Sequence, residues 1–175
     1  MIHFETERLL FRDFELKDLP EFKRMNEDSE VMRYFPKTLS HEETESFFHA
    51  IVDEWKAYGY GLFAVERKDN GEFIGFIGFH RATFEADFTP CIEIGWRLKK
   101  EAWGHGFATE GAKACLKYAE TAYDFKNIYS FTAKINMPSE RVMQKIGLVK
   151  IKAFSHPKLD PNSPLSEHVL YALKK

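Results

Sequence analysis

The sequence predicts an α/β (α+β) domain built on a central mixed, mostly antiparallel sheet of about seven strands, flanked by about four helices. Two observations carry this prediction. Leu62–Arg67 and Glu72–His80 are strand-like runs separated by an Asp-Asn-Gly turn, which is typical of an antiparallel hairpin. Within the second run, Phe73–Phe79 is apolar on both faces, as expected for a central strand that has helices on each side. A hairpin makes part of the sheet antiparallel, so the sheet is predicted to be mixed rather than wholly parallel.

Composition narrows the class of protein. At 175 residues the chain is long enough to bury a substantial core, and one domain spanning residues 1–175 is expected. The net charge of −2, with acidic and basic residues interspersed, argues against the broad basic surface that nucleic acid requires. The chain has neither a signal-like start nor an apolar run of membrane-spanning length. Cys91 and Cys115 suit core positions in a reducing compartment, so we expect a cytoplasmic protein.

The N-terminal third is predicted to contain one strand and two helices. Thr6–Arg12 alternates as a strand, and Asp18 is a suitable cap for a short helix that follows it. The second helix spans Glu42–Tyr58, where Ser40 and Glu43 fit a capping box. Its apolar residues recur every three or four positions and predict a face packed on the core: Phe47, Phe48, Ile51, Val52 and Trp55.

The remaining elements follow the strand Cys91–Leu98. A helix is predicted after it, because small and apolar residues recur at four-residue spacing: Phe107, Gly111, Cys115 and Ala119. Ile128–Ile135 is a strand, and a short helix begins at Asn136 and stops at Gly147. Two further strands, Val149–Ala153 and Glu167–Leu173, complete the sheet on either side of a proline-bearing loop.

The segment between the strand Cys91–Leu98 and its helix carries the main functional signal. Gly104 and Gly106 remove side chains where the chain turns into a helix start, which has unpaired N–H groups and the positive end of a dipole. This pattern suits a phosphate group, and a tight turn that needs glycine dihedrals would give it too. No nucleotide P-loop run is present, and Thr109 stands where a dinucleotide fingerprint needs a third glycine or alanine.

A third phosphate loop fits better. Trp103–Ala108 resembles the pyrophosphate loop of the GNAT superfamily of acetyl-CoA-dependent N-acetyltransferases, Gln/Arg-x-x-Gly-x-Gly/Ala, with Gly106 and Ala108 at its last two positions. Trp103 departs from the first position, where Gln or Arg is usual. Together with Glu93–Trp96, the segment looks like the RimJ/RimL-like branch that acetylates ribosomal-protein N-termini, in which tryptophan is common at that position. The predicted order of elements also matches GNAT topology, so the resemblance covers almost the whole chain.

The resemblance implies direct transfer of an acetyl group from acetyl-CoA to a primary amine, with no metal. The implied CoA site runs along the strand end, the loop and the next helix start, and Asn136 would hydrogen-bond the pantetheine arm. A backbone N–H in the neighbourhood of Gly95–Leu98 would stabilise the thioester oxygen. The implied cofactor-binding residues are Trp96, Arg97, Leu98, Trp103, Gly104, His105, Gly106, Phe107, Ala108, Thr109, Asn136 and Ser139.

Two residues are candidates for the proton transfers that the reaction needs. Glu93 is the candidate base, because a carboxylate near an apolar sheet has its charged form disfavoured and its pKa brought nearer working pH. A structural carboxylate is the alternative. The tyrosine that acts as acid in many family members is replaced by Met143, whereas Ser139 matches the serine of the ribosomal-protein branch. Ser139 could equally be a plain helix cap.

The acceptor amine is the least specified part of the prediction. The resemblance favours a protein or peptide N-terminus, while a polyamine or an aminoglycoside-like drug remains an alternative. Segments 27–40 and 154–166 are expected to border the acceptor groove, and the first carries Glu27, Asp28 and Glu30, which would attract a cationic amine. The loss of the tyrosine at Met143 leaves a non-catalytic acyl-CoA-binding regulatory domain as another hypothesis. Either a monomer or a homodimer is compatible with the sequence.

Overall fold

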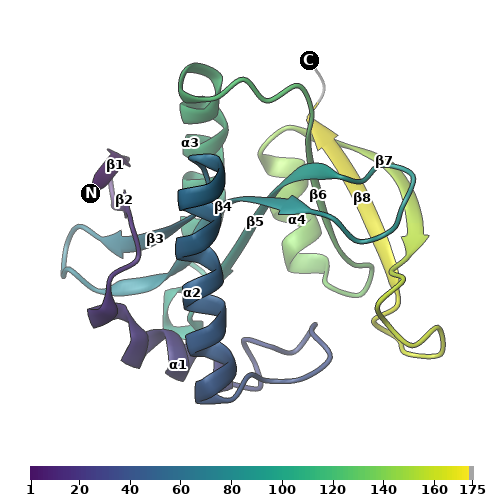
Figure 1. Cartoon of the computed structure of the whole chain (residues 1–175), viewed down its shortest axis with the longest axis horizontal. Helices are drawn as coiled ribbons and strands as arrows, with labels where there is room; N and C mark the ends of the chain where they lie inside the picture. Colours follow the sequence, from purple (N-terminus) through teal and green to yellow (C-terminus); the bar gives the residue numbers. More distant parts are fainter. Residues whose placement is uncertain (174–175) are drawn as a thin grey trace.

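A computed structural model describes residues 1–173, and their eight strands form one sheet in the order β1–β2–β3–β4–β5–β6–β8–β7 (Figure 1). Among the described strands, β5 and β6 are the one parallel pair. The predicted mixed, mostly antiparallel sheet is therefore confirmed, with one strand more than expected. The strands are β1 (Ile2–Glu5), β2 (Leu9–Arg12), β3 (Leu62–Arg67), β4 (Phe73–Ala82), β5 (Cys91–Leu98), β6 (Ile128–Ala133), β7 (Leu148–Ser155) and β8 (Glu167–Leu173).

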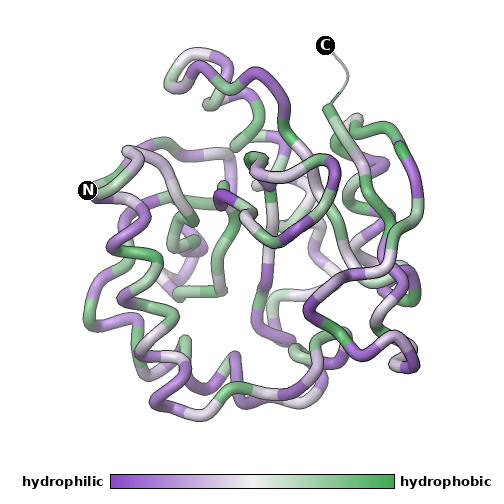
Figure 2. Tube along the Cα trace, turned by 45° about the vertical axis from the view of Figure 1, so that its right-hand side comes forward, coloured by the Kyte–Doolittle hydropathy of each residue, from purple (hydrophilic) through white to green (hydrophobic). Residues whose placement is uncertain are grey.

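Helices cover both faces of the sheet. α1 (Leu19–Glu27) and α2 (His41–Tyr58) lie on one face, and α3 (Phe107–Ala122) and α4 (Met137–Lys145) lie on the other (Figure 1). Apolar and polar residues alternate along the helical turns, as expected of helices that bury one side (Figure 2). No helix within residues 1–173 is long and apolar enough to cross a membrane. Each face of the sheet thus has its own buried apolar cluster. The site described below is built on β5, one of the strands that separate the two clusters.

The N-terminal strand is the element that the sequence prediction missed. β1 pairs with β2, and Phe4 stacks on Phe11 with ring centroids 4.4 Å apart. The strand predicted over Thr6–Arg12 begins only at Leu9, because the amide of Thr6 donates to the carbonyl of Leu9 and closes a turn. Ile2 and Phe4 do alternate with polar residues, but four residues are too few for that pattern to stand out.

The two predicted helix starts have different outcomes. The capping box of α2 is confirmed, since Ser40 Oγ accepts from the amide of Glu43 at 3.1 Å and Glu43 Oε1 accepts from the amide of Ser40 at 3.0 Å. The predicted cap by Asp18 is wrong. Asp18 precedes α1, but its buried carboxylate accepts two hydrogen bonds of 2.8 Å from Arg12 instead of capping the helix. A buried ion pair has taken the place of the local cap.

The pairing of β5 with β6 is the feature that positions the site. It comprises Ile92 with Ile128 and Glu93 with Tyr129, after which the two strands share no further register. On its other side β5 stays paired with β4 along its full length, from Cys91 to Leu98. Beyond Glu93, one edge of β5 therefore has no strand beside it.

Candidate active site

The side chains of β5 separate the site into two parts. Ile94 and Leu98 are buried in the cluster beneath α3, and Trp96 packs against that cluster. Because successive side chains of a strand point to opposite faces, Glu93, Gly95 and Arg97 point to the face that carries α1 and α2. The end of β5 therefore leads into the loop before α3, while Glu93 and Arg97 place their side chains on the α2 side.

The loop between β5 and α3 is built from backbone. Gly104 and Gly106 both have φ of +78°, in the left-handed region that favours glycine. A Cβ added at Gly106 would meet nothing nearer than Arg8 Nη2 at 3.7 Å, so this glycine is required by its dihedral rather than by crowding. Gly106 is the N-cap of α3 and offers no side-chain acceptor to the first amides of the helix, at Phe107, Ala108 and Thr109. Open amides at a helix start fit phosphate oxygens.

Trp103 and His105 have different roles in this loop. The indole Nε1 of Trp103 donates to the carbonyl of Leu98 at 3.0 Å, so the side chain ties the loop to the end of β5 while 47% of the residue stays exposed. His105 is exposed, and its ring stacks on Phe107 at 5.3 Å. The tryptophan that departs from the family motif thus has a local structural function.

Glu93 lies where the β5–β6 pairing stops. The residue is partly buried, yet its carboxylate has no hydrogen bond or ion pair with any residue in the part of the chain that the structure describes. Neither carboxylate oxygen is fully buried. Burial raises the pKa of Glu93 to about 7, with a further upward contribution from Glu54 and an opposing one from His80. The carboxyl group is therefore accessible and able to exchange a proton near neutral pH.

A second carboxylate and a histidine lie beside Glu93, and the sequence analysis assigned a role to neither of them. His80 on β4 is the cross-strand partner of Glu93, and its Nδ1 is 2.7 Å from Oε2 of Glu54 on α2. This hydrogen bond raises the pKa of His80 above its usual value. Glu54 falls three residues after Ile51, at the edge of the apolar stripe of α2, and an acid at that position was the available signal. Only the folded sheet shows that it meets His80.

Arg97 lies among residues of α1 and α2 rather than beside the α3 loop. Its Nη1 donates to Oδ1 of Asn26 at 3.0 Å, and the guanidinium carbon is 4.6 Å from the ring centroid of Phe35. The rings of Phe47 and Phe76 lie 5.6 and 5.2 Å away. Burial lowers the pKa of Arg97 to about 10. Arg97 was expected at the cofactor site, but its side chain lies on the α2 side of the sheet.

The start of α4 holds the other sequence-predicted residues. Asn136 caps the helix, since its Oδ1 accepts from the amide of Ser139 at 3.3 Å and its Nδ2 donates to Oγ1 of Thr132 at 3.0 Å. The hydroxyl of Ser139 has no hydrogen-bond partner within residues 1–173, and it is not fully buried. Met143 is buried in the core beneath α3 and α4. The structure therefore leaves the hydroxyl of Ser139 unused, whereas both polar atoms of the Asn136 side chain form hydrogen bonds.

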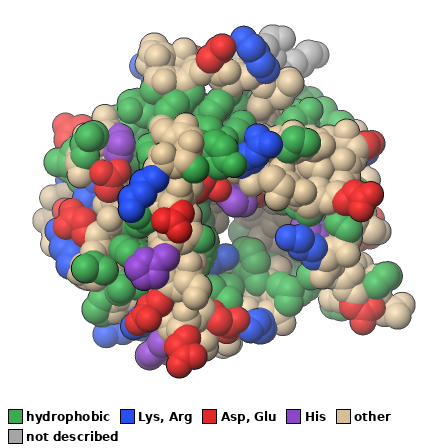
Figure 3. Space-filling view, in the orientation of Figure 1, with side chains coloured by type: hydrophobic (Ala, Val, Ile, Leu, Met, Phe, Trp, Pro, Cys, Tyr) green, Lys and Arg blue, Asp and Glu red, His purple; other side chains and the backbone are tan. Residues whose placement is uncertain are grey.

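The α2 side of the sheet is hollowed between α2 and the C-terminal strands, and histidine, acidic and basic side chains lie around the hollow (Figure 3). On the C-terminal side, half-buried aromatic rings form a cluster from three parts of the chain: Phe84, Phe88, Phe131, Phe154 and His156. In the segment 27–40, Glu27 pairs with His41 and Glu30 with Lys100. Each of these two carboxylates therefore has a basic side chain within ion-pair distance.

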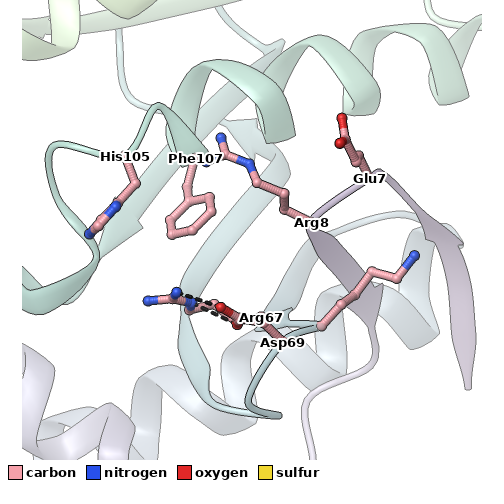
Figure 4. Close-up of a pocket in the computed structure, with 7 residues that line it drawn as sticks. Glu7, Arg8, Arg67, Asp69, His105 and Phe107 are labelled. Atoms are coloured by element: carbon pink, nitrogen blue, oxygen red, sulfur yellow. Dashed lines mark hydrogen bonds and ion pairs between the residues drawn. The ribbon is translucent and has the colours of Figure 1, made fainter.

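The start of α3 also borders a cavity of about 350 Å³ (Figure 4). Arg8, just before β2, and Arg67, the last residue of β3, reach it from the same end of the β2–β3 pair, and both guanidinium groups lie over the ring of Phe107. Each arginine already has an acidic partner, Glu110 for Arg8 and Asp69 for Arg67. Within residues 1–173, no cluster of histidine, cysteine and acidic side chains could hold a metal ion.

Comparison with known proteins gives a consistent family. The family described as acetyltransferase (GNAT) domain matches residues 8–149. An uncharacterized N-acetyltransferase of Bacillus subtilis, YnaD, is 34% identical over 84% of this chain and 82% of its own length. A GNAT-family acetyltransferase structure from Bacillus anthracis has a TM-score of 0.79 and 31% identity, covering 99% of this chain and 98% of that one.

The ribosomal-protein acetyltransferases are more distant. RimL, a ribosomal α-N-protein acetyltransferase solved in complex with coenzyme A, has a TM-score of 0.80 and 15% identity, covering 98% of this chain and 97% of its own. This likeness shows a shared fold and does not assign the chain to that branch. The family match and the Bacillus relatives go further: the chain belongs to the GNAT acetyltransferase family and is an acyltransferase.

Proposed function

We propose that residues 1–175 act as one N-acetyltransferase domain that uses acetyl-CoA and transfers its acetyl group directly to a primary amine, favouring a protein or peptide N-terminus. The observation that carries the proposal is the end of the β5–β6 pairing at Glu93. One strand there combines an unpartnered carboxyl group, an open backbone edge and, at its end, a glycine-built helix start. These are the three parts that acetyl transfer from CoA to an amine requires.

Coenzyme A is proposed to bind mainly to backbone. Its pyrophosphate would accept hydrogen bonds from the first amides of α3, where Gly106 leaves them uncapped. The pantetheine arm would lie along the open edge of β5. The carbonyl of Ile94 points to that side, since it accepts from Oγ of Ser130 on β6 at 2.8 Å. By alternation the amides of Trp96 and Leu98 face the same way, which makes them the candidate donors to the thioester oxygen.

Glu93 is proposed to take the proton that the acceptor amine must lose, directly or through one water molecule. A pKa of about 7 leaves a large share of the carboxyl groups ionised at neutral pH and still able to accept a proton. The free amine then attacks the thioester carbon, the new C–N bond forms and the C–S bond breaks. The CoA thiolate leaves with a proton, for which the unpartnered hydroxyl of Ser139 is the candidate donor, and Ser139 regains a proton from the nitrogen, which loses its second proton as the amide forms. The resemblance to the ribosomal-protein branch supports this role for Ser139.

The acceptor is proposed to lie in the hollow between α2 and the C-terminal aromatic cluster. A peptide end suits an open groove, whereas a polyamine or an aminoglycoside would need unpaired carboxylates to hold its several positive charges. Glu27, Asp28 and Glu30 were the sequence-based candidates for that attraction. Glu27 and Glu30 each have a basic side chain within ion-pair distance, whereas Asp28 accepts a hydrogen bond from the amide of Glu30. These contacts make the segment less available to a polycation, which supports the peptide.

A thiol-release assay with acetyl-CoA tests the proposal. Peptides with N-terminal Ser, Ala or Met are compared with spermidine and an aminoglycoside at equal concentrations, and initial rates are measured. We expect the peptides to react faster. A clear preference for spermidine or the aminoglycoside would overturn the acceptor assignment but not the acetyl transfer. Binding of acetyl-CoA without turnover on any of these amines would favour the non-catalytic alternative, which the replacement of the usual tyrosine by Met143 suggests.

A further inference from the structure

Arg97 is a largely buried charge that has no anion beside it in the part of the chain that the structure describes. Its Nη1 bonds the neutral amide of Asn26, while its Nε is buried without any acceptor. Its Nη2 also has no acceptor among residues 1–173, and it is not fully buried. Taking a guanidinium out of water without a counterion is costly, so an arginine in this state is unusual unless a ligand supplies the missing charge.

Arg12 shows how the same protein treats a structural arginine. It is 5% exposed, and its guanidinium is paired with Asp18 at 2.8 Å and with Glu66 at 2.9 Å. Arg12 therefore has two carboxylates within hydrogen-bond distance, whereas Arg97 has none among residues 1–173. The difference indicates that the partner of Arg97 lies outside the chain.

The surroundings of Arg97 hold its guanidinium in place. The rings of Phe35, Phe47 and Phe76 lie within 4.6 to 5.6 Å of the guanidinium carbon. Asn26, which is 0% exposed, is itself fixed by a hydrogen bond from its Nδ2 to Thr44 Oγ1 at 3.3 Å. A planar guanidinium held in this way can present Nη2, which is not fully buried, to a carboxylate. The site is therefore ordered before a ligand arrives.

Glu93 and Arg97 share one sheet face, and only Gly95 stands between them. A Cβ added at Gly95 would meet a single atom within 4 Å, the Oε2 of Glu93 at 3.9 Å, so the space above this glycine is open. At about 3.3 Å per residue the two Cα atoms are roughly 13 Å apart. A carboxylate at one end of this space suits an amine, and an arginine at the other suits an anion.

We propose that Arg97 binds a carboxylate of the acceptor, which makes the preferred acceptor an amine that carries an acidic group at a distance. When the lengths of the Glu93 and Arg97 side chains are taken into account, the amine and the carboxylate of such an acceptor should be roughly 6–10 Å apart. An N-terminal peptide with Asp or Glu as its second or third residue meets this requirement. A simple amino acid does not, since its carboxylate is attached to the carbon that bears the amine. This inference rests on the proposed function and narrows its substrate class.

Matched peptides test the inference without altering the protein. Two pairs of N-terminal Ser hexapeptides are used, identical except for Glu or Gln at the second residue in one pair and at the third in the other. The wild-type enzyme is expected to prefer the Glu member of at least one pair by about ten- to a hundredfold in kcat/KM, mostly through KM. Should only small amines react, glutamate and glutamine replace the peptides, because the glutamate side chain carries the distant carboxylate.

Variants then assign the preference to Arg97. In Arg97→Gln the preference is expected to disappear, because rates on the Glu peptide fall to those on the Gln peptide, while Arg97→Lys retains part of it. Arg24→Gln removes an exposed arginine from α1 and is the matched control. Thermal unfolding and CoA affinity are measured for each variant, and if Arg97→Gln does not fold, the Lys variant and the wild-type peptide pairs decide.

Three outcomes are distinguishable. Equal kcat/KM values for Glu and Gln at both positions in the wild type would overturn the inference and leave acetyl transfer intact. A preference that persists unchanged in Arg97→Gln would do the same. No turnover on any amine would overturn the proposed function, and this inference with it.

Discussion

The two parts of the site that meet at β5 are built from different materials. The loop before α3 uses backbone, in which two glycines at φ of +78° leave the first amides of a helix uncapped. The α2 side uses side chains, in which Glu93 and Arg97 have no ion pair with any of the described residues 1–173. The first part is contiguous in sequence, whereas the second assembles residues of α1, α2, β4 and β5. Backbone can therefore serve a ligand that never varies, while side chains can select among ligands.

The two parts also differ in what they cost the fold. An uncapped helix start on the surface exchanges protein hydrogen bonds for water, which costs little. Unpaired charges in a partly buried groove are less favourable than charges in water. Burial therefore raises the pKa of Glu93 and lowers the pKa of Arg97, which favours the neutral form of each residue. Changes in the loop are thus expected to affect cofactor binding, and changes on the α2 side to affect turnover, selectivity and stability.

The largest expected effect is on cofactor binding, and it tests the loop separately from the α2 side. Gly106→Val should lower CoA affinity on the order of tenfold or more, because a branched side chain is strained at this φ and the amides of α3 move with it. Isothermal calorimetry with CoA measures the loss. Gly59→Val is the matched control, since Gly59 has φ of +73° at the end of α2, with no atom within 4 Å of an added Cβ. Equal CoA affinity in both variants would contradict the role of the loop.

Glu93→Gln addresses the α2 side. Turnover is expected to fall by roughly 10²–10⁴ while CoA affinity is kept, because the amine loses its proton acceptor. Wild-type kcat should rise with pH through about 7 as Glu93 ionises. The variant should lack this limb and recover only at higher pH, where more amine is already neutral. A variant with the wild-type rate and pH profile would make Glu93 a structural carboxylate.

The same substitution has an opposite effect on stability. Because the folded protein raises the pKa of Glu93 to about 7, its protonated form is favoured on folding. Stability is therefore highest below the unfolded pKa and is lost as pH rises toward 7. Glu93→Gln should then unfold a few degrees above wild type at pH 8 and close to it at pH 4. A variant that is less stable than wild type at pH 8 would contradict the unpaired state of this carboxylate.

Ser139→Ala should have a smaller effect on the rate. A fall on the order of ten- to a hundredfold in kcat is expected, since water can replace the hydroxyl as the proton donor to the thiolate. The helix should survive, because the N-cap bond uses the backbone amide of Ser139 and not its hydroxyl. Far-ultraviolet circular dichroism checks the helix. Unchanged kcat would remove the proposed role of Ser139 as proton donor, and the helix-cap alternative is already wrong, since Asn136 caps α4.

The smallest effect concerns the pair behind Glu93. Glu54→Gln should lower the pKa of His80, because the hydrogen bond from the His80 ring to the Glu54 carboxylate is the main cause of its upward shift. An NMR titration of the His80 ring protons measures this directly. His49→Asn, an exposed change on the same helix, should leave that pKa unaltered. An unmoved His80 pKa in Glu54→Gln would show that the two side chains are not bonded in solution.

Local features of the sequence predicted local features of the structure. The strand Cys91–Leu98, the capping box of α2 and the glycine turn into α3 all depend on neighbouring residues, and each was found as expected. Asp18 was assigned wrongly as a cap because its partner, Arg12, belongs to a strand and competes for the same carboxylate. β1 was missed because its stability comes from pairing with β2 rather than from four residues of its own.

The sequence by itself determined the mixed α/β fold, the backbone loop before α3 and the candidacy of Glu93, because periodicity, glycine dihedrals and motif spacing act over a few residues. Tertiary structure alone decided which charges are left unpaired. Glu54, His80 and Glu93 lie far apart in sequence and meet only when α2 packs on the sheet. Arg97 likewise acquires its aromatic neighbours from α2 and the preceding segment. Among residues 1–173 no carboxylate lies beside it, and no sequence pattern could have shown this. Pairing and burial of charge depend on distance in space, and distance in space is what the fold sets.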